Sequence, residues 1–280
     1  MTSAQETASP IYLVGIDGSD QSRDALIWAC RLAERTGALV HAVTAWRFPP
    51  AAPMPVVGSP LPSPDVFERA AQRRLDDTIE ASGMEVADRR LAKGHPALAL
   101  IELSAEYDLV VVGRTGRGRI ARMLIGSTAR HVAKEATCPV AIVDGPELFD
   151  EVVVAVDGSD NSIASLRWAA PLASDVEVTA IYSHDERFLD ELAFDSTFRR
   201  NLDQLACAVV DRSVAESGVD PEAINVEIRS GDPRTMIVDA IEGELLVLGG
   251  CGQGLLARLI GSLANYAIGH TSGPVVIWRG

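Results

Sequence analysis

LVVVGRTGRG, at residues 109–118, is the stretch that decides the fold, together with LIGST at residues 124–128. The continuous apolar run at its start predicts a strand that is buried on both faces, as in a parallel sheet. The run ends at Gly113, and the glycines that follow let the backbone bend and lie close to a ligand. A periodic segment from Thr128 to Glu135 then predicts a helix, with Ser127 or Thr128 as its N-cap.

A strand, a glycine-rich loop and a helix N-terminus in this order indicate an anion site. Unpaired backbone N–H groups and the positive end of the helix dipole point toward whatever binds there. The glycine spacing differs from that of a Walker A loop and from the dinucleotide-binding fingerprint. A tight turn that only connects the strand to the helix stays as an alternative. The phosphate interpretation is favoured by four arginines in the segment, Arg114, Arg117, Arg119 and Arg122.

Composition limits the class of protein. The chain has 280 residues, of which 47% are hydrophobic and 23% charged, which is typical of one large or two ordinary globular domains. A net charge of −14 disfavours a general nucleic-acid or anionic-membrane binder. Four cysteines without a C-x-x-C pair indicate a reducing compartment. With no signal peptide and no apolar run of membrane-spanning length, we expect a cytoplasmic protein.

The chain contains a tandem repeat. The tetrapeptide DGSD occurs at residues 17–20 and again at 157–160, each time between an apolar strand and a helical segment. ALIWA at 25–29 is matched by SLRWA at 165–169, and later motifs keep the same order and spacing. We therefore predict two domains, residues 1–146 and 147–280.

Each half alternates predicted strands with predicted helices, which favours a parallel α/β sheet covered by helices on both faces. Ligands of such sheets bind outside the carboxyl ends of the strands, where Asp17 and Gly113 lie. The first helix is expected over residues 22–34, with Gly37 after its end. A proline-rich stretch from Phe48 to Pro64 predicts a stiff loop, either a surface excursion or a lid. The expected strands are residues 11–16, 39–46, 84–92, 108–113 and 139–143, then 151–156, 176–183, 224–229, 245–249 and 274–278.

With both motifs present in each half, the chain resembles the universal stress protein family, in particular its tandem actinobacterial members. That family carries Asp-Gly-Ser after its first strand and Gly-x2-Gly-x9-Gly-(Ser/Thr) late in the domain, which Gly113, Gly116, Gly126 and Ser127 match. The resemblance implies two tandem five-stranded parallel sheets of order 3-2-1-4-5 flanked by helices, an adenine-nucleotide alpha-hydrolase-like fold. It also implies ATP binding, which many members show.

The resemblance assigns roles by position. Asp17, in the turn with Gly18 and Ser19, resembles the acidic residue that meets the adenosine part of ATP, although a turn or N-cap role is the alternative. Ala45 matches the position whose backbone meets adenine. The implied phosphate contacts are Gly113, Arg114, Gly116, Arg117, Gly126, Ser127 and Thr128.

The second half departs from this pattern. Its matching positions are one residue closer together between the second and third glycine, which turns a helical segment by about 100°. Its loop has fewer arginines, and Leu263 stands where the first half has Thr128. We predict that the first site binds ATP, with Mg²⁺ as the usual companion of a triphosphate, and that the second binds it weakly or not at all. Equal binding stays open. The matching positions are Asp157, Ser183, Gly249, Gly252, Gly261 and Ser262.

The last strand of each half is expected at an edge of its sheet. In the family these edges pair across a two-fold axis, so residues 140–143 and 275–278 could pair within one chain, and whole chains could still dimerise. We find no catalytic motif such as G-x-S-x-G. The predicted function is a nucleotide-dependent stress-response regulator. The alternatives are a slow ATPase and a nucleotide-free interaction protein whose glycines only form turns.

Overall fold

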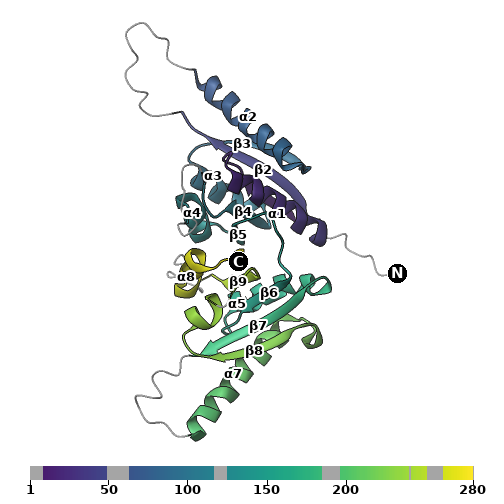
Figure 1. Cartoon of the computed structure of the whole chain (residues 1–280), viewed down its shortest axis with the longest axis vertical. Coiled ribbons are helices and arrows are strands. Elements are labelled where there is room, and N and C mark those ends of the chain that lie inside the picture. The colour runs from purple at the N-terminus through teal and green to yellow at the C-terminus, as the bar shows by residue number, and fades with distance from the viewer. Residues whose placement is uncertain are drawn as a thin grey trace, which may run out of the picture.

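A computed structural model describes residues 9–48, 63–116, 125–184, 196–239, 241–250 and 261–279. The two halves repeat one order of elements and lie at opposite ends of the long axis (Figure 1). The first half comprises β1 (Ile11–Gly15), α1 (Asp20–Thr36), β2 (Leu39–Trp46), α2 (Pro64–Ser82), β3 (Asp88–Lys93), α3 (Pro96–Leu103), β4 (Leu109–Gly113), α4 (Ser127–Glu135) and β5 (Val140–Val143). The second comprises β6 (Glu151–Ala155), α5 (Asp160–Ala169), β7 (Glu177–His184), α7 (Ser196–Ser217), β8 (Asn225–Ser230), β9 (Leu245–Gly249), α8 (Ser262–His270) and β10 (Val275–Trp278).

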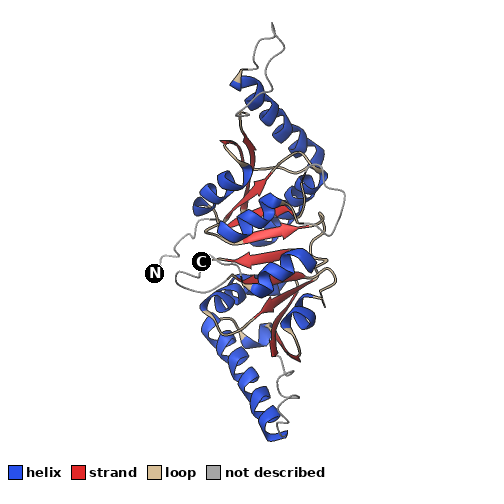
Figure 2. Cartoon of the chain, turned by 90° about the vertical axis from the view of Figure 1, so that its left-hand side faces the viewer, coloured by secondary structure: helices blue, strands red, loops and turns tan. Residues whose placement is uncertain are grey.

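The strand order confirms the predicted fold class. Within the first half all strand pairs are parallel and the order is β3-β2-β1-β4-β5, and the second half repeats it as β8-β7-β6-β9-β10. Strands β5 and β10 pair antiparallel, with Ala141 opposite Val276, so the chain forms one ten-stranded sheet (Figure 2). This β5–β10 seam pairs the inner edge strand of each half, so β3 and β8 remain as the edge strands of the whole sheet.

Alternation along the strands explains why helices cover both faces. In β4, Val111 packs into the layer that contains Leu26 of α1 and Leu75 of α2. Its neighbours Val110 and Val112 belong to the opposite layer, with residues of α3 and α4. Successive side chains of a strand point to opposite faces, so a strand between two helical layers must be apolar at every position. The valine run predicted this burial correctly.

Most predicted boundaries differ from the structure by at most one residue, and the larger shifts are in α1 and β3. Helix α1 begins at Asp20, two residues before the expected start, because the Ser19 side chain accepts a hydrogen bond from Ser22 N and caps it. Gly37 ends it in the left-handed conformation, with φ of 68°, as predicted. Strand β3 begins at Asp88 instead of residue 84. The preceding residues form the connection from α2, where Met84 N donates to Ser82 Oγ rather than to a strand.

The two longest described helices, α2 and α7, lie at the far ends of the molecule (Figure 1). Helix α2 buries Leu75 and Ile79 against the sheet, while its other faces are exposed and charged. None of the helices in the described ranges has the length and apolar character that crossing a membrane requires. The proline-rich stretch expected to form a loop falls almost entirely on residues 49–62, which lie outside the described residues.

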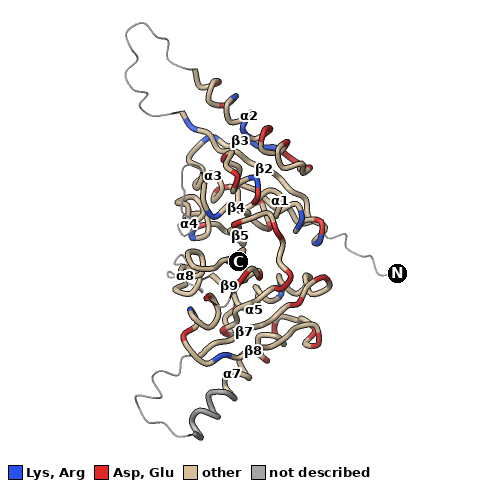
Figure 3. The backbone as a smooth tube through the Cα atoms, viewed as in Figure 1, with Lys and Arg blue, Asp and Glu red and all other residues tan. Residues whose placement is uncertain are grey.

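Charged residues are distributed over both halves. Acidic and basic positions are interspersed along the tube in Figure 3, and the excess of acidic residues gives the net charge of −14. Most described ion pairs are local and at least partly exposed, such as Arg23 with Asp20 in the first turn of α1. Exposed pairs of this kind contribute little to stability. Arg114 is different, because its side chain is buried.

The segment between the halves is packed rather than extended. Phe149 is 1% exposed, and its ring centroid lies 6.3 Å from that of Trp28 in α1. The Arg35 guanidinium lies 5.6 Å from the same ring, and Arg31 Nη1 donates to the Pro146 carbonyl at 2.8 Å. Helix α1 therefore holds the connecting segment on the molecule, and Phe149 belongs to the core.

We predict that Phe149→Ala lowers the free energy of unfolding by about 3–5 kcal/mol, because it removes a fully buried ring and leaves a cavity. Urea unfolding followed by circular dichroism measures the loss. Leu98→Ala is the control, since Leu98 is 57% exposed and should change stability by less than about 0.5 kcal/mol. A loss of under about 1 kcal/mol in Phe149→Ala would mean that the connecting segment does not contribute to the core.

Candidate functional site

A pocket of about 240 Å³ opens at the carboxyl ends of β1, β2 and β4. Strand β1 pairs with β2 on one side and with β4 on the other. The order in which the chain adds strands to the sheet therefore reverses at β1. Such a switch point is where ligands of parallel α/β sheets bind. Of the predicted site residues, those that line the pocket are Asp17, Ala45, Gly113, Gly116, Gly126, Ser127 and Thr128.

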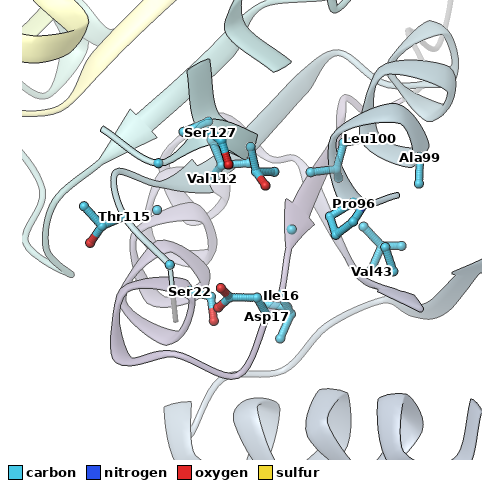
Figure 4. A pocket seen from close by; sticks show the side chains of 17 residues that line it. Ile16, Asp17, Ser22, Val43, Pro96, Ala99, Leu100, Val112, Thr115 and Ser127 are labelled. Atoms are coloured by element: carbon cyan, nitrogen blue, oxygen red, sulfur yellow. The ribbon is translucent and has the colours of Figure 1, made fainter. Parts of the chain in front are cut away.

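Asp17 stands at one end of the pocket, at the close of β1 (Figure 4). Its Oδ1 accepts hydrogen bonds from Ser19 N at 3.0 Å and Ser19 Oγ at 2.5 Å. A Cβ atom on Gly116 would lie only 2.5 Å from the other carboxylate oxygen. Glycine at 116 therefore lets the loop after β4 approach the carboxylate, and the two predicted motifs meet. Gly18 and Ser19 shape this turn, with a φ of 81° at Gly18, and do not line the pocket.

The N-terminus of α4 forms the opposite end of the pocket, where Ser127 lies in Figure 4. The N-cap is Gly126, so the prediction of Ser127 or Thr128 as N-cap was wrong. Gly126 N donates to the Arg114 carbonyl at 2.7 Å, which fixes the chain one residue earlier. In the described part of the chain no side chain caps α4, whereas Ser19 caps α1. The first N–H groups of α4 consequently stay available to an anion.

An apolar wall completes the pocket. It is formed by Val43 of β2 and by Pro96, Ala99 and Leu100 of α3, which lie together along one side in Figure 4. These residues were not predicted from the sequence, because an apolar helix cannot be distinguished from core by its pattern alone. The repeated glycine and proline at the start of α3 and its counterpart were the available signal. Other lining residues that were not predicted are Gly15, Ile16, Ser22, Val112, Thr115 and Ala129.

Arg114 does not place its side chain in the pocket, contrary to the expectation that it contacts phosphate. It is 3% exposed, and its guanidinium donates to the carbonyls of Ile268 at 2.7 Å and Gly273 at 2.8 Å in the second half. Burial lowers the pKa of this guanidinium, and the Asp144 carboxylate partly opposes that shift. Arg117, the other predicted arginine, lies outside the described residues.

A second, larger pocket of about 610 Å³ occupies the equivalent position at the ends of β6, β7 and β9. Asp157 Oδ1 accepts from Ser159 N at 2.9 Å, as Asp17 does from Ser19. The wall differs, because Arg234 and Asp232 line this pocket beside Pro233. The predicted residues that line it are Asp157, Ser183, Gly249, Gly261 and Ser262, while Gly252 lies outside the described residues.

The chain matches known proteins along its whole length. The universal stress protein family model matches residues 11–144 and again residues 148–279. Universal stress protein Rv2005c of Mycobacterium tuberculosis is 27% identical over 291 residues, covering 95% of this chain and 96% of the relative. The crystal structure of a universal stress protein from Archaeoglobus fulgidus shares the fold, with a TM-score of 0.67, 18% identity and coverage of 98% of this chain and 99% of that one.

A further solved structure, a universal stress protein in complex with cAMP, matches 50% of this chain and 99% of its own, with 29% identity and a TM-score of 0.36. The nucleotide in that structure is a property of that protein. The family model, in contrast, accounts for both halves of the present chain. The two residue ranges that the family model matches correspond to the two halves of the repeat, which is present both in the sequence and in the strand order. The chain belongs to the universal stress protein family.

Proposed function

We propose that the first pocket binds ATP and that the protein acts as a nucleotide-dependent regulator in the stress response. This proposal rests on one observation: Asp17 and the uncapped N-terminus of α4 line opposite ends of the same pocket. One end supplies a hydrogen-bond acceptor and the other supplies N–H donors with a positive dipole. A nucleoside with an attached phosphate chain matches that polarity, since its sugar hydroxyls donate and its phosphates accept.

The chemistry of the lining suits each part of ATP. A flat base fits the apolar wall of Val43, Pro96 and Leu100, and the Asp17 carboxylate can accept from ribose hydroxyls. The phosphates would take the N–H groups at the start of α4 and the hydroxyls of Ser127 and Thr128. The glycines keep side-chain bulk away from that path.

Regulation is favoured over catalysis. Asp17 is the one carboxylate among the described lining residues, and it already accepts two hydrogen bonds from Ser19. A dedicated base that would position a water is therefore missing from the described lining, and we propose at most slow hydrolysis. Mg²⁺ would enter with the triphosphate. Occupancy would change the affinity for a protein partner only if ATP binds two conformations differently.

We propose that each domain, residues 1–146 and 147–280, contains one site and that the second is weaker for ATP. Support comes from the second wall, where charged Asp232 and Arg234 line the pocket beside Pro233, and from Leu263 in place of Thr128. The seam between β5 and β10 would act as a dimer interface inside one chain, and whole chains could associate further. Free thiols at Cys30, Cys138 and Cys207 suit a reducing cytoplasm.

Native mass spectrometry of freshly purified protein counts the bound nucleotides. We expect one ATP per chain. The first pocket combines Asp17, an apolar wall and the hydroxyls of Ser127 and Thr128 at the start of α4, whereas the second has charged residues in its wall and Leu263 in place of Thr128. Two per chain would contradict the weaker second site. None, even after addition of ATP and Mg²⁺, would favour the alternative of a nucleotide-free interaction protein.

We predict that Gly116→Glu weakens ATP binding at least about 100-fold, or about 2.7 kcal/mol. The new Cβ would be 2.5 Å from an Asp17 oxygen, and the added carboxylate would repel both Asp17 and the phosphates. Isothermal titration calorimetry measures the change. Gly145→Glu is the matched control, since a Cβ there meets nothing within 4 Å and affinity should persist.

Paired alanine variants test the difference between the sites. Asp17→Ala and Asp157→Ala each remove the same turn hydrogen bond, to Ser19 N and Ser159 N respectively. We expect ATP affinity to fall about 10- to 100-fold in Asp17→Ala, the size of a hydrogen bond to a charged group, and to stay near wild type in Asp157→Ala. Equal losses in the two variants would show that the sites contribute equally.

A further inference from the structure

Arg114 belongs to both halves of the molecule. Its backbone is part of the loop after β4, where its N–H donates to the Val143 carbonyl at 2.7 Å and its carbonyl accepts from Gly126 N at 2.7 Å. Its side chain leaves the first half and donates to the carbonyls of Ile268 and Gly273. One residue thus fixes the start of α4 and contacts the second half.

The receiving group is the C-terminus of α8, a nine-residue helix. Carbonyl oxygens in the last turn lack partners within the helix and carry the negative end of its dipole, so a buried guanidinium is well placed there. Arg114 Nη1 donates to the Ile268 carbonyl in that turn, and Nη2 lies 3.3 Å from Thr271 Oγ1 just after it. At the other end of α8, Gly261 and Ser262 line the second pocket. A single rigid helix therefore connects Arg114 to that pocket.

A second set of contacts connects the guanidinium to the Asp17 side of the first pocket. Arg114 Nε lies 3.6 Å from an Asp144 carboxylate oxygen. Gln21 Nε2, in the first turn of α1, donates to the carbonyl and to Oδ1 of Asp144, both at 3.3 Å. Helix α1 begins directly after the turn that contains Asp17. Both motifs of the first pocket are consequently within a few contacts of Arg114.

The residue equivalent to Arg114 in the second half does not make the same contact. The position equivalent to Arg114 is Gly250, whose N–H donates to the Trp278 carbonyl at 2.8 Å, as Arg114 N does to Val143. It has no side chain to reach across, and a Cβ there would lie 2.7 Å from the Trp278 carbonyl oxygen. Its carbonyl accepts instead from Asn161 Nδ2 at 2.7 Å. Position 250 in the described part of the second loop thus does not repeat the contact that Arg114 makes.

We propose that Arg114 is a positioning residue that couples ligand occupancy of the first pocket to α8 and so to the second pocket. This inference rests on the proposed nucleotide binding. A ligand that accepts hydrogen bonds from the loop and from α4 restricts the Arg114 backbone, so the guanidinium loses less conformational freedom when it holds α8. By linkage, a ligand or partner that stabilises α8 strengthens binding in the first pocket by the same factor.

Hydrogen–deuterium exchange of the full chain, with and without ATP and Mg²⁺, tests this coupling. In the wild type we expect slower exchange near the first pocket, at residues 126–129, and at the C-terminal turn of α8, residues 267–271. The remote slowing should be at least about fivefold, the lower end of usual coupling factors. Arg114→Met has no donors, so it should keep the slowing near the first pocket and lose the remote one. Arg114→Lys keeps the charge but has a single nitrogen instead of the planar fork that reaches Ile268 and Gly273 from separate nitrogens, and should lose most of the remote slowing.

Two controls separate the possible sources. Gly116→Glu keeps the arginine contacts and blocks the first pocket, so it should lose both effects, and remote slowing that persists there would show direct binding in the second pocket and overturn the proposal. The remote slowing should survive in Asp157→Ala.

Local slowing in the wild type without any change in the exchange of α8 would also overturn the proposal. No slowing anywhere would instead count against the proposed nucleotide binding. If Arg114→Met raised exchange throughout the chain, equally with and without ATP, Arg114 would have a structural role only and the proposal would be overturned.

Discussion

The antiparallel pairing of β5 with β10 is the interaction on which the rest of the arrangement depends. A five-stranded parallel half ends in a strand with unpaired N–H and C=O groups, and such an edge is a template for uncontrolled pairing. Here each half closes the edge of the other, with Val140 opposite Ile277 and Val275 opposite Ile142. All four strand residues are fully buried. The seam also brings the loop after β4 close to the end of α8, without which Arg114 would have no partner in the second half.

Helix capping divides four of the helices that begin at the carboxyl edge of the sheet into two kinds. Helices α1 and α5 follow the Asp-Gly-Ser turns and are capped by Ser19 and Ser159. Helices α4 and α8 have Gly126 and Gly261 as their N-cap residues, and neither has a side-chain cap in the described structure. Backbone N–H groups that already have a partner contribute little to binding, while those without one gain from an anion. The turn motif thus precedes capped helices, while the glycine motif leaves the first N–H groups of α4 and α8 without a side-chain cap.

The alternation of strands and helices predicted the fold class from local pattern, whereas the strand order and the pocket positions were implied by the resemblance to the family, and the predicted residues make up seven of the 17 that line the first pocket. A continuous valine run is stable in a strand that is buried on both faces. At residue 116 a side chain would clash with the Asp17 carboxylate, so glycine is required there. The direction of Arg114 was not predictable, since its acceptors at Ile268 and Gly273 lie more than 150 residues away along the chain. The apolar wall was missed for a related reason: Leu100 packs with core residues and lines the pocket at once. The late start of β3 depends on a turn hydrogen bond at Ser82 that carries no periodic signal.

Joining the halves in one chain has a consequence for symmetry. In a homodimer of identical single domains, the same residue stands on both sides of the two-fold axis, and any device at the interface occurs twice. The single chain escapes that rule, so Arg114 faces α8 while its counterpart is Gly250, with no room for a side chain. Two halves within one chain can therefore differ at equivalent positions, as residues 114 and 250 do, whereas two identical subunits cannot.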